Sequence, residues 1–302
     1  MMHNYCRFLL LILALGAAKS SAAALSVFAC EPEWASLTRV LGGDRVAVVS
    51  ATTAHQDPHR IEARPSLIAK VRRADLLVCS GAELEIGWLP MLQRQAGNRK
   101  VMPGQAGYFA AADQVERLGI PDRIDRSMGD VHASGNPHVH LDPRRLKTIA
   151  TALGERLASL DSSNAAHYRE RLASFILRWD EAMMRWQERA QPLRGKRLVV
   201  HHQDWEYLFD WLGIVKAGSL EPKPGVPASS GHLAKLKKAL LAEPSLAIIH
   251  THYQSPKAAR RLSQLTGIPA VELPYTVGGA ENVVDLFTLF DETLQRLLEV
   301  VP

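Results

Sequence analysis

Residues 165–193 read AAHYRERLASFILRWDEAMMRWQERAQPL, and this stretch decides how the chain is organised. Apolar residues recur along it at helical spacing, and no strand pattern interrupts them. A helix of about 27 residues is about 40 Å long at 1.5 Å per residue, which is long for a helix inside one globular domain. The stretch therefore predicts a rigid linker helix, which we place at 161–192, between a lobe at 25–160 and a lobe at 193–302.

Short β-rich runs alternate with helical patterns on both sides of this helix. In the first lobe we expect strands at 25–29, 45–51, 75–81 and 99–103, with helices at 31–43 and 64–74. In the second we expect strands at 196–202, 214–220, 246–252 and 268–274, with helices at 205–213, 231–243 and 255–267. Such alternation favours an α/β fold with mostly parallel sheets in both lobes.

The first 24 residues have the layout of a secretory signal peptide. Arg7 precedes an apolar run from Phe8 to Ala18, and small residues follow, so we expect cleavage near Ala23 or Ala24. The formal net charge of the 302 residues is +5, which is mildly basic. Because no dense run of Lys and Arg is interleaved with aromatic residues, nucleic acid is not an expected partner.

Two cysteines remain after the predicted cleavage, Cys30 and Cys79. Each ends an apolar run that is typical of a buried parallel strand, LSVFAC and ADLLVC. Adjacent parallel strands bring their carboxyl ends together, and an exported protein meets oxidising conditions, so we expect a disulfide. Two unpaired buried thiols are the alternative.

Most of the 12 histidines fall in short clusters at strand ends or in loops. The clusters are His55 with His59, His132 with His138 and His140, His201 with His202, and His250 with His252. Ligands of open α/β sheets bind beyond the carboxyl ends of the strands, so these clusters indicate a metal site at the strand ends. Three imidazoles with one carboxylate suit zinc, whereas magnesium and calcium prefer oxygen ligands.

The residue pattern leaves several choices open. Either His138 or His140 could bind the metal, and the same choice arises between His201 and His202, since neighbouring side chains of an extended segment point in opposite directions. His250 and His252 could support ligands or simply be polar strand-end residues. We expect His167 and His232 to be ordinary surface or capping residues.

Three motifs in order along the chain resemble the zinc and manganese solute-binding proteins of ABC transporters, the cluster A-I family. They are QDPHRIEARPSLIAKVRRADLLVCSGAELEIGWLP (56–90), NPHVHLDPRRL (136–146) and VVHHQDWEYLFDWLGI (199–214). The resemblance implies a metal held in the cleft between the two lobes, with His59, His138 and His202 as its ligands. It also implies a monomeric periplasmic protein that passes its ion to a membrane permease, and the third histidine is typical of zinc importers.

The chain departs from this family where an aspartate ligand is usual. In VELPYTVGGAENVVDLF (271–287), Tyr275 falls at the position of that aspartate. The fourth ligand would then be Asp285, Glu281, Glu272 or water, and we choose Asp285. The family's His-rich loop is reduced to MGDVHASGNPHVH (128–140), which could still capture metal through Asp130, His132 and His140 and deliver it to His138. A flexible solvated loop without such a role is the alternative.

A secreted zinc hydrolase is the alternative function, since a metal site with bound water could also be hydrolytic. The sequence contains neither a His-Glu-x-x-His helix nor a Gly-x-Ser-x-Gly elbow. A zinc carrier that is not an enzyme is therefore the prediction.

Overall fold

The computed structural model describes residues 24–123, 125, 128–129 and 131–302. The signal peptide predicted for residues 1–24 lies outside this part of the chain except for its last residue, and its cleavage stays a prediction. Within the described residues, no helix is long and apolar enough to cross a membrane.

The first lobe is built on a parallel sheet with the strand order β2-β1-β3-β4. Its strands are β1 (Leu25–Ala29), β2 (Val46–Ser50), β3 (Leu76–Cys79) and β4 (Tyr108–Ala110). Its connecting helices are α1 (Pro32–Gly42), α2 (Pro65–Arg73) and α3 (Leu89–Ala96). Each of these helices carries a proline in its first turn, where the missing N–H is not needed.

The second lobe repeats this topology with the strand order β6-β5-β7-β8, again all parallel. Its strands are β5 (Arg197–Val200), β6 (Val215–Ser219), β7 (Ala247–Thr251) and β8 (Ala270–Leu273). Its helices are α6 (Glu206–Leu212), α7 (Ser230–Ala242), α8 (Lys257–Thr266) and α9 (Leu286–Leu298). The predicted α/β class with two parallel-sheet lobes is confirmed.

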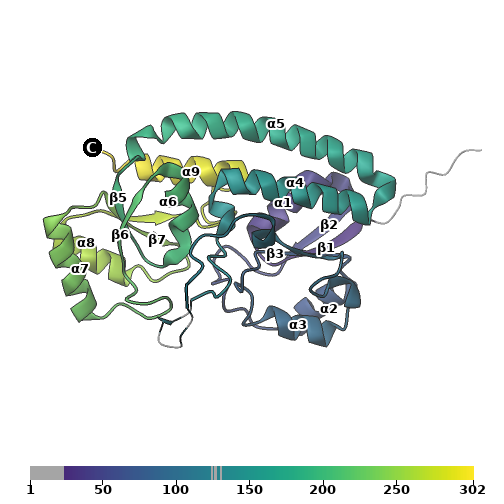
Figure 1. Cartoon of the computed structure of the whole chain (residues 1–302), viewed down its shortest axis with the longest axis horizontal. Coiled ribbons are helices and arrows are strands. Elements are labelled where there is room, and N and C mark those ends of the chain that lie inside the picture. Colours follow the sequence, from purple (N-terminus) through teal and green to yellow (C-terminus); the bar gives the residue numbers. More distant parts are fainter. Residues whose placement is uncertain (1–23, 124, 126–127, 130) are drawn as a thin grey trace, which may run out of the picture.

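Two long helices, α4 (Pro143–Leu160) and α5 (Ala165–Arg189), join the lobes. Figure 1 shows α5 running along one side of the molecule over both lobes, beside α4 and α9. The predicted linker helix is therefore present. Its buried residues are spaced three and four apart, as expected for a helix with one apolar face: Tyr168, Leu172, Phe175, Trp179, Ala182 and Trp186.

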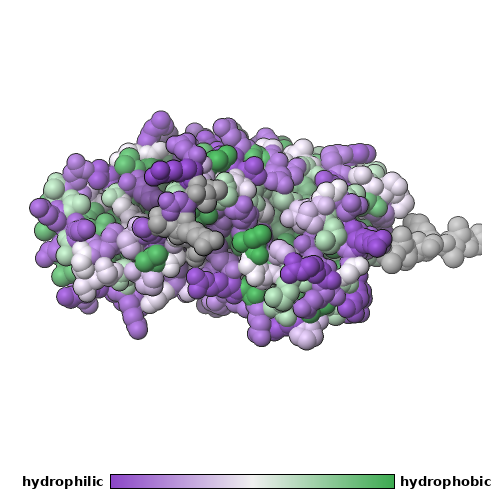
Figure 2. Space-filling view, turned by 60° about the horizontal axis from the view of Figure 1, so that its bottom comes forward, coloured by the Kyte–Doolittle hydropathy of each residue, from purple (hydrophilic) through white to green (hydrophobic). Residues whose placement is uncertain are grey.

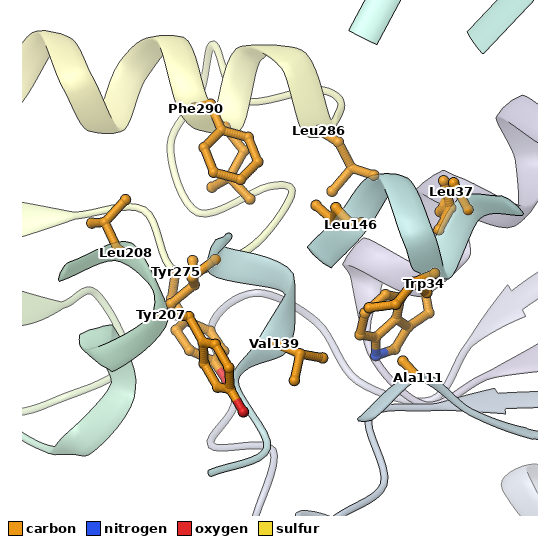
Figure 3. Packing of buried hydrophobic residues seen from close by; sticks show 14 of the residues in the cluster. Trp34, Leu37, Ala111, Val139, Leu146, Tyr207, Leu208, Tyr275, Leu286 and Phe290 are labelled. Atoms are coloured by element: carbon orange, nitrogen blue, oxygen red, sulfur yellow. The ribbon is translucent and has the colours of Figure 1, made fainter. Parts of the chain in front are cut away.

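One hydrophobic core continues from lobe to lobe beneath α5. Figure 3 shows part of it, with Trp34 and Leu37 of α1 at one end and Phe290 of α9 at the other. Rings of α5 meet rings of α9 directly, with centroids 4.9 Å apart for Trp179 and Phe287. By contrast, hydrophilic residues dominate the face of the molecule that Figure 2 shows, and hydrophobic residues are scattered over it.

The strand predicted at 99–103 is wrong. Arg99–Val101 is a short 3₁₀ helix, and the edge strand is β4, seven residues later. Val101 is apolar because it fills the core beside α3, where its carbonyl accepts a hydrogen bond from Gln93 at 2.8 Å. Only three residues form β4, too few to give a clear strand pattern.

The predicted disulfide between Cys30 and Cys79 is present, with the two Cα atoms 4.8 Å apart. The strand register explains it: Ala29 of β1 faces Val78 of β3, so the next residues along both strands meet. A bridge that closes a loop of this length typically stabilises a fold by about 2–4 kcal/mol. It fixes the ends of two strands close to the loops that carry the candidate ligands.

A pair of buried carboxyl groups lies directly beside this disulfide. Backbone N–H groups of Ser80 and Gly81 donate to the Glu85 carboxylate at 2.7 and 3.1 Å, and the Ser80 hydroxyl donates to Glu31. Burial, together with the charges of Glu85 and Glu33, raises the pKa of Glu31 well above its ordinary value of 4.5. Burial also raises the pKa of Glu85 to about 7. Near neutral pH the pair therefore holds a proton, which we place on Glu31.

This proton makes stability depend on pH. The unfolded chain releases it above pH 4.5 and the folded chain keeps it, so the stabilisation is complete at low pH and is lost as pH rises through the folded pKa. We expect the free energy of unfolding of the metal-free wild type to fall more between pH 5 and pH 8 than that of Glu31→Gln. Urea titrations at both pH values measure the free energy of unfolding. The substitution Glu116→Gln, at an exposed position, is the matched control. Equal pH slopes for wild type and Glu31→Gln would contradict the assignment.

Candidate metal centre

The three histidines that the family motifs indicate meet between the two lobes. His59 lies in the loop after β2, His138 precedes a 3₁₀ turn at Val139–Leu141, and His202 follows β5. Their ring centroids are 5.8 Å apart for His59 and His138, 5.6 Å for His59 and His202, and 6.2 Å for His138 and His202. Two of these imidazoles thus come from the first lobe and one from the second.

The turn that carries His59 aims its imidazole into this cluster. The Asp57 carboxylate lies 2.8 Å from His59 Nδ1 and accepts a hydrogen bond from the His59 backbone N–H at 3.0 Å. Trp88 fixes the turn from below, because its indole N–H donates to the Pro58 carbonyl. Burial opposes ionisation of Asp57, but its hydrogen bond with His59 lowers its pKa overall. With Nδ1 occupied, Nε2 of His59 faces the cluster.

His138 is 1% exposed and is held from the other lobe. Its Nδ1 lies 2.6 Å from the Tyr275 hydroxyl, and its backbone N–H donates to the Asn136 side chain at 2.9 Å. Burial and the neighbouring imidazoles of His59 and His202 lower the pKa of His138 well below its ordinary value. The ring is therefore neutral, which is the form that binds a metal.

His202 follows the same arrangement in the second lobe. Its Nδ1 lies 2.6 Å from the Glu221 carboxylate, which leaves Nε2 free. Burial works against its protonation, but the charge of Asp204 and the hydrogen bond with Glu221 raise the pKa of His202 to about 9. All three imidazoles thus have a partner at Nδ1, the arrangement that orients histidine ligands in metal sites.

Asp204 supplies a carboxylate that the sequence reasoning missed. It is fully buried, and its Oδ1 lies 3.6 Å from His138 Nε2. Its Oδ2 accepts a hydrogen bond from the Gln254 amide at 2.7 Å. His138, His202 and Asp204 each offer a ligand atom within 4.8 Å of the others. The acidic residue two positions after the histidine in HHQDW was the available clue.

The structure places Asp285 in a different role. Asp285 is the N-cap of α9, and its carboxylate accepts hydrogen bonds from the Thr288 N–H and hydroxyl, both at 2.8 Å. Glu272 and Glu281 are exposed. None of these three acids belongs to a group of neighbouring ligand atoms among the described residues. Their carboxylates therefore do not join the histidine cluster.

His132 approaches the cluster from the shortened loop. Its Nε2 lies 3.3 Å from His59 Nε2, and the two rings are stacked. Glu83 holds this part of the loop by accepting hydrogen bonds from the Ala133 N–H and the Ser134 hydroxyl, at 2.7 and 3.2 Å. Asp130 lies outside the described residues.

Most of the other histidines in the described chain bond to backbone carbonyls. His140 Nε2 donates to the Tyr275 carbonyl at 3.0 Å, and His201 belongs to none of the ligand groups in the described chain. His252 binds the Ala54 carbonyl, and His232 and His167 bind the carbonyls of Ser219 and Gly42. Of the neighbouring histidines between which the sequence left a choice, His138 and His202 are the two whose rings lie in the cluster with His59.

Two cavities reach the cluster, and both are lined in part by His59 and Arg60. One of about 220 Å³ is lined by Asp57, His59, Arg60, His202, Glu221, Gly225, Tyr253 and Gln254. The other, of about 390 Å³, is lined by His59, Arg60, Glu83, Leu84, Ile86, Gly87, Gly129, Val131 and His132. An ion could therefore reach the imidazoles without opening the core.

Comparison with known proteins gives a consistent set of relatives. The metal ABC transporter substrate-binding lipoprotein SloC of Streptococcus mutans is 22% identical over 276 residues, covering 90% of this chain and 87% of that protein. The manganese ABC transporter substrate-binding lipoprotein scaA of Streptococcus gordonii is 26% identical over 185 residues, which is 57% of this chain and only 56% of that protein.

Solved structures share the fold. A crystal structure of ZnuA superposes with a TM-score of 0.77 at 20% identity, over 92% of this chain and 100% of that chain. The cadmium-bound periplasmic metal binding protein from candidatus liberibacter asiaticus gives 0.76 at 16% identity, over 91% and 99%. Residues 27–300 match the family model described as ZnuA, Zinc-uptake complex component A periplasmic. The chain therefore belongs to the ZnuA family, whose members are solute-binding proteins of ABC transporters and not enzymes.

Proposed function

We propose that this protein is an exported zinc carrier, which binds one zinc ion between its lobes and delivers it to the membrane permease of an ABC transporter. The observation that carries the proposal is the convergence of three imidazoles, each held at Nδ1, beside one buried carboxylate. The N-terminal pattern of residues 1–24 supports export to the periplasm, where the protein would act as a monomer.

The donor set favours zinc as the cargo. The family description names zinc, whereas the relative scaA is named for manganese. The names of similar proteins therefore do not distinguish zinc from manganese as the cargo. Three imidazole nitrogens with one carboxylate form a four-coordinate set that suits zinc, and zinc binding displaces the proton that the raised pKa of His202 keeps on its ring in the metal-free protein. Manganese is better served by carboxylate, carbonyl and water oxygens.

We assign the ligands to His59, His138, His202 and Asp204. Asp204 replaces Asp285 as our choice of fourth ligand, because the Asp285 carboxylate is engaged at the N-terminus of α9. His132 lines a different cavity from His202, and we assign it to the capture of arriving ions with His59. The alternative of a zinc hydrolase has no support in the family.

Replacement of any single imidazole ligand should weaken zinc binding strongly. Removal of a residue that only supports a metal ligand typically lowers metal affinity about 10- to 100-fold. We expect the zinc affinity of His59→Ala, His138→Ala and His202→Ala each to fall by more than that. His167→Ala and His232→Ala are the controls, since both rings bind backbone carbonyls instead. Competition with a zinc chelator measures the affinities, and similar losses in all five variants would refute the assignment.

A matched pair of aspartate variants tests the fourth ligand. Asp204→Asn should weaken zinc binding and Asp285→Asn should not, because Asp285 serves the α9 capping box. Asp285→Asn should instead change stability by at most about 1 kcal/mol, since asparagine also caps helices well. Chelator competition and urea unfolding separate the two effects. Loss of zinc binding in Asp285→Asn alone would return the fourth ligand to that residue.

Growth tests the cargo. A bacterial strain in which this gene is deleted should stop growing when zinc is chelated, and added zinc should restore growth where added manganese does not. A plasmid copy of the wild type should complement the deletion, and one carrying His202→Ala should not. Rescue by manganese only, together with manganese in the purified protein, would show that the cargo is manganese.

A further inference from the structure

We propose that Tyr275 is a positioning residue that determines which nitrogen of His138 binds the metal, and that the first lobe clamps Tyr275 in place. This inference rests on the proposed function, because it concerns how the same site is prepared for zinc. It assigns a role to the residue that stands where the resembling family has a carboxylate.

The contact between Tyr275 and His138 joins the two lobes inside the core. Tyr275 follows β8 and is 2% exposed, and its hydroxyl lies 2.6 Å from His138 Nδ1. The other nitrogen, Nε2, points toward the Asp204 carboxylate at 3.6 Å. Because Tyr275 occupies Nδ1, only Nε2 remains for the ion.

The chemistry of imidazole makes this contact selective. A neutral imidazole that binds a metal through Nε2 carries its proton on Nδ1, and that N–H needs an acceptor. A phenol oxygen can accept this bond and can also donate when the metal is absent. Asp57 and Glu221 serve His59 and His202 in the same way, but with charged groups. Tyr275 serves His138 without adding a charge.

Residues of the first lobe hold the segment that carries this phenol. His140 donates to the Tyr275 carbonyl at 3.0 Å, and its ring meets the Tyr275 ring edge-on at 4.9 Å. The hydroxyl of Thr276 donates to Glu33 of α1, whose carboxylate is fully buried. These contacts fix the position of the Tyr275 ring independently of its hydroxyl. Removal of the hydroxyl should therefore leave the packing of the ring unchanged.

Tyr275→Phe tests the proposal by removing only that hydroxyl. We expect its zinc affinity to fall about 10- to 100-fold, the loss typical of removing a partner of a histidine ligand. Tyr168→Phe is the matched control, because this tyrosine of α5 is also buried and lies away from the histidine cluster. Its hydroxyl donates a hydrogen bond to Asp161 at 2.8 Å. The control should bind zinc as the wild type does.

Nitrogen NMR of the ¹⁵N-histidine-labelled, zinc-loaded protein separates positioning from a merely structural role. In the wild type, His138 should carry its proton on Nδ1 and bind through Nε2, and in Tyr275→Phe this pattern should be mixed or reversed. Binding of His138 through Nδ1 in the wild type, or zinc affinity of Tyr275→Phe within twofold of the wild type, overturns the inference. A wild type that binds no zinc would instead overturn the proposed function.

Discussion

The candidate site depends on a fixed relation between two sheets that share no strand. His59 and His138 precede α5 in the chain, and His202 and Asp204 follow it, so rotation of one lobe against the other would move these side chains apart. The apolar stripe of α5 packs into one continuous core with α4 and α9 and opposes such a rotation. Burial in that core is thus what holds polar groups of both lobes at bonding distance.

Orientation adds a second requirement, since an imidazole in the right place can still offer the wrong nitrogen. The supporting groups come from increasing distances along the chain: Asp57 is two residues from His59, Glu221 is 19 from His202, and Tyr275 is 137 from His138. The contact between Asp57 and His59 is local, because both residues lie in the same short turn. The last exists only when both lobes are folded and packed together, so the geometry at His138 reports on the whole fold.

Local patterns predicted much of this structure from the sequence. The alternation of strands and helices, the linker helix and the pairing of Cys30 with Cys79 follow from periodicity and from the geometry of parallel strands. The position of the histidine cluster follows from strand ends and family motifs. The prediction of a strand at 99–103 was wrong because Val101 is buried by packing beside α3 and not by pairing in a sheet.

The acids of the site could not be predicted in this way. Asp285 opens a helix in the sequence as it does in the structure, but its carboxylate is used by the capping box there. Asp204 follows a ligand motif closely, yet its burial becomes visible only when Tyr253 and Gln254, about 50 residues later, are seen to enclose it. Such contacts depend on how β5 and β7 lie side by side, which no local pattern records.

Electrostatics give a reason for a tyrosine at position 275. Burial opposes ionisation of Asp57 and Glu221, but their hydrogen bonds with His59 and His202 lower the pKa of both, so each is charged. With Asp204, three acidic side chains lie around the imidazole cluster. Burial, and then the neighbouring Tyr253, Glu33 and Asp204, raise the pKa of Tyr275 well above its usual value, so the phenol stays neutral. A carboxylate there would bring a further negative charge into a region of low dielectric constant, where repulsion between like charges is strong. Tyr275 supplies the hydrogen bond that His138 needs and avoids that repulsion.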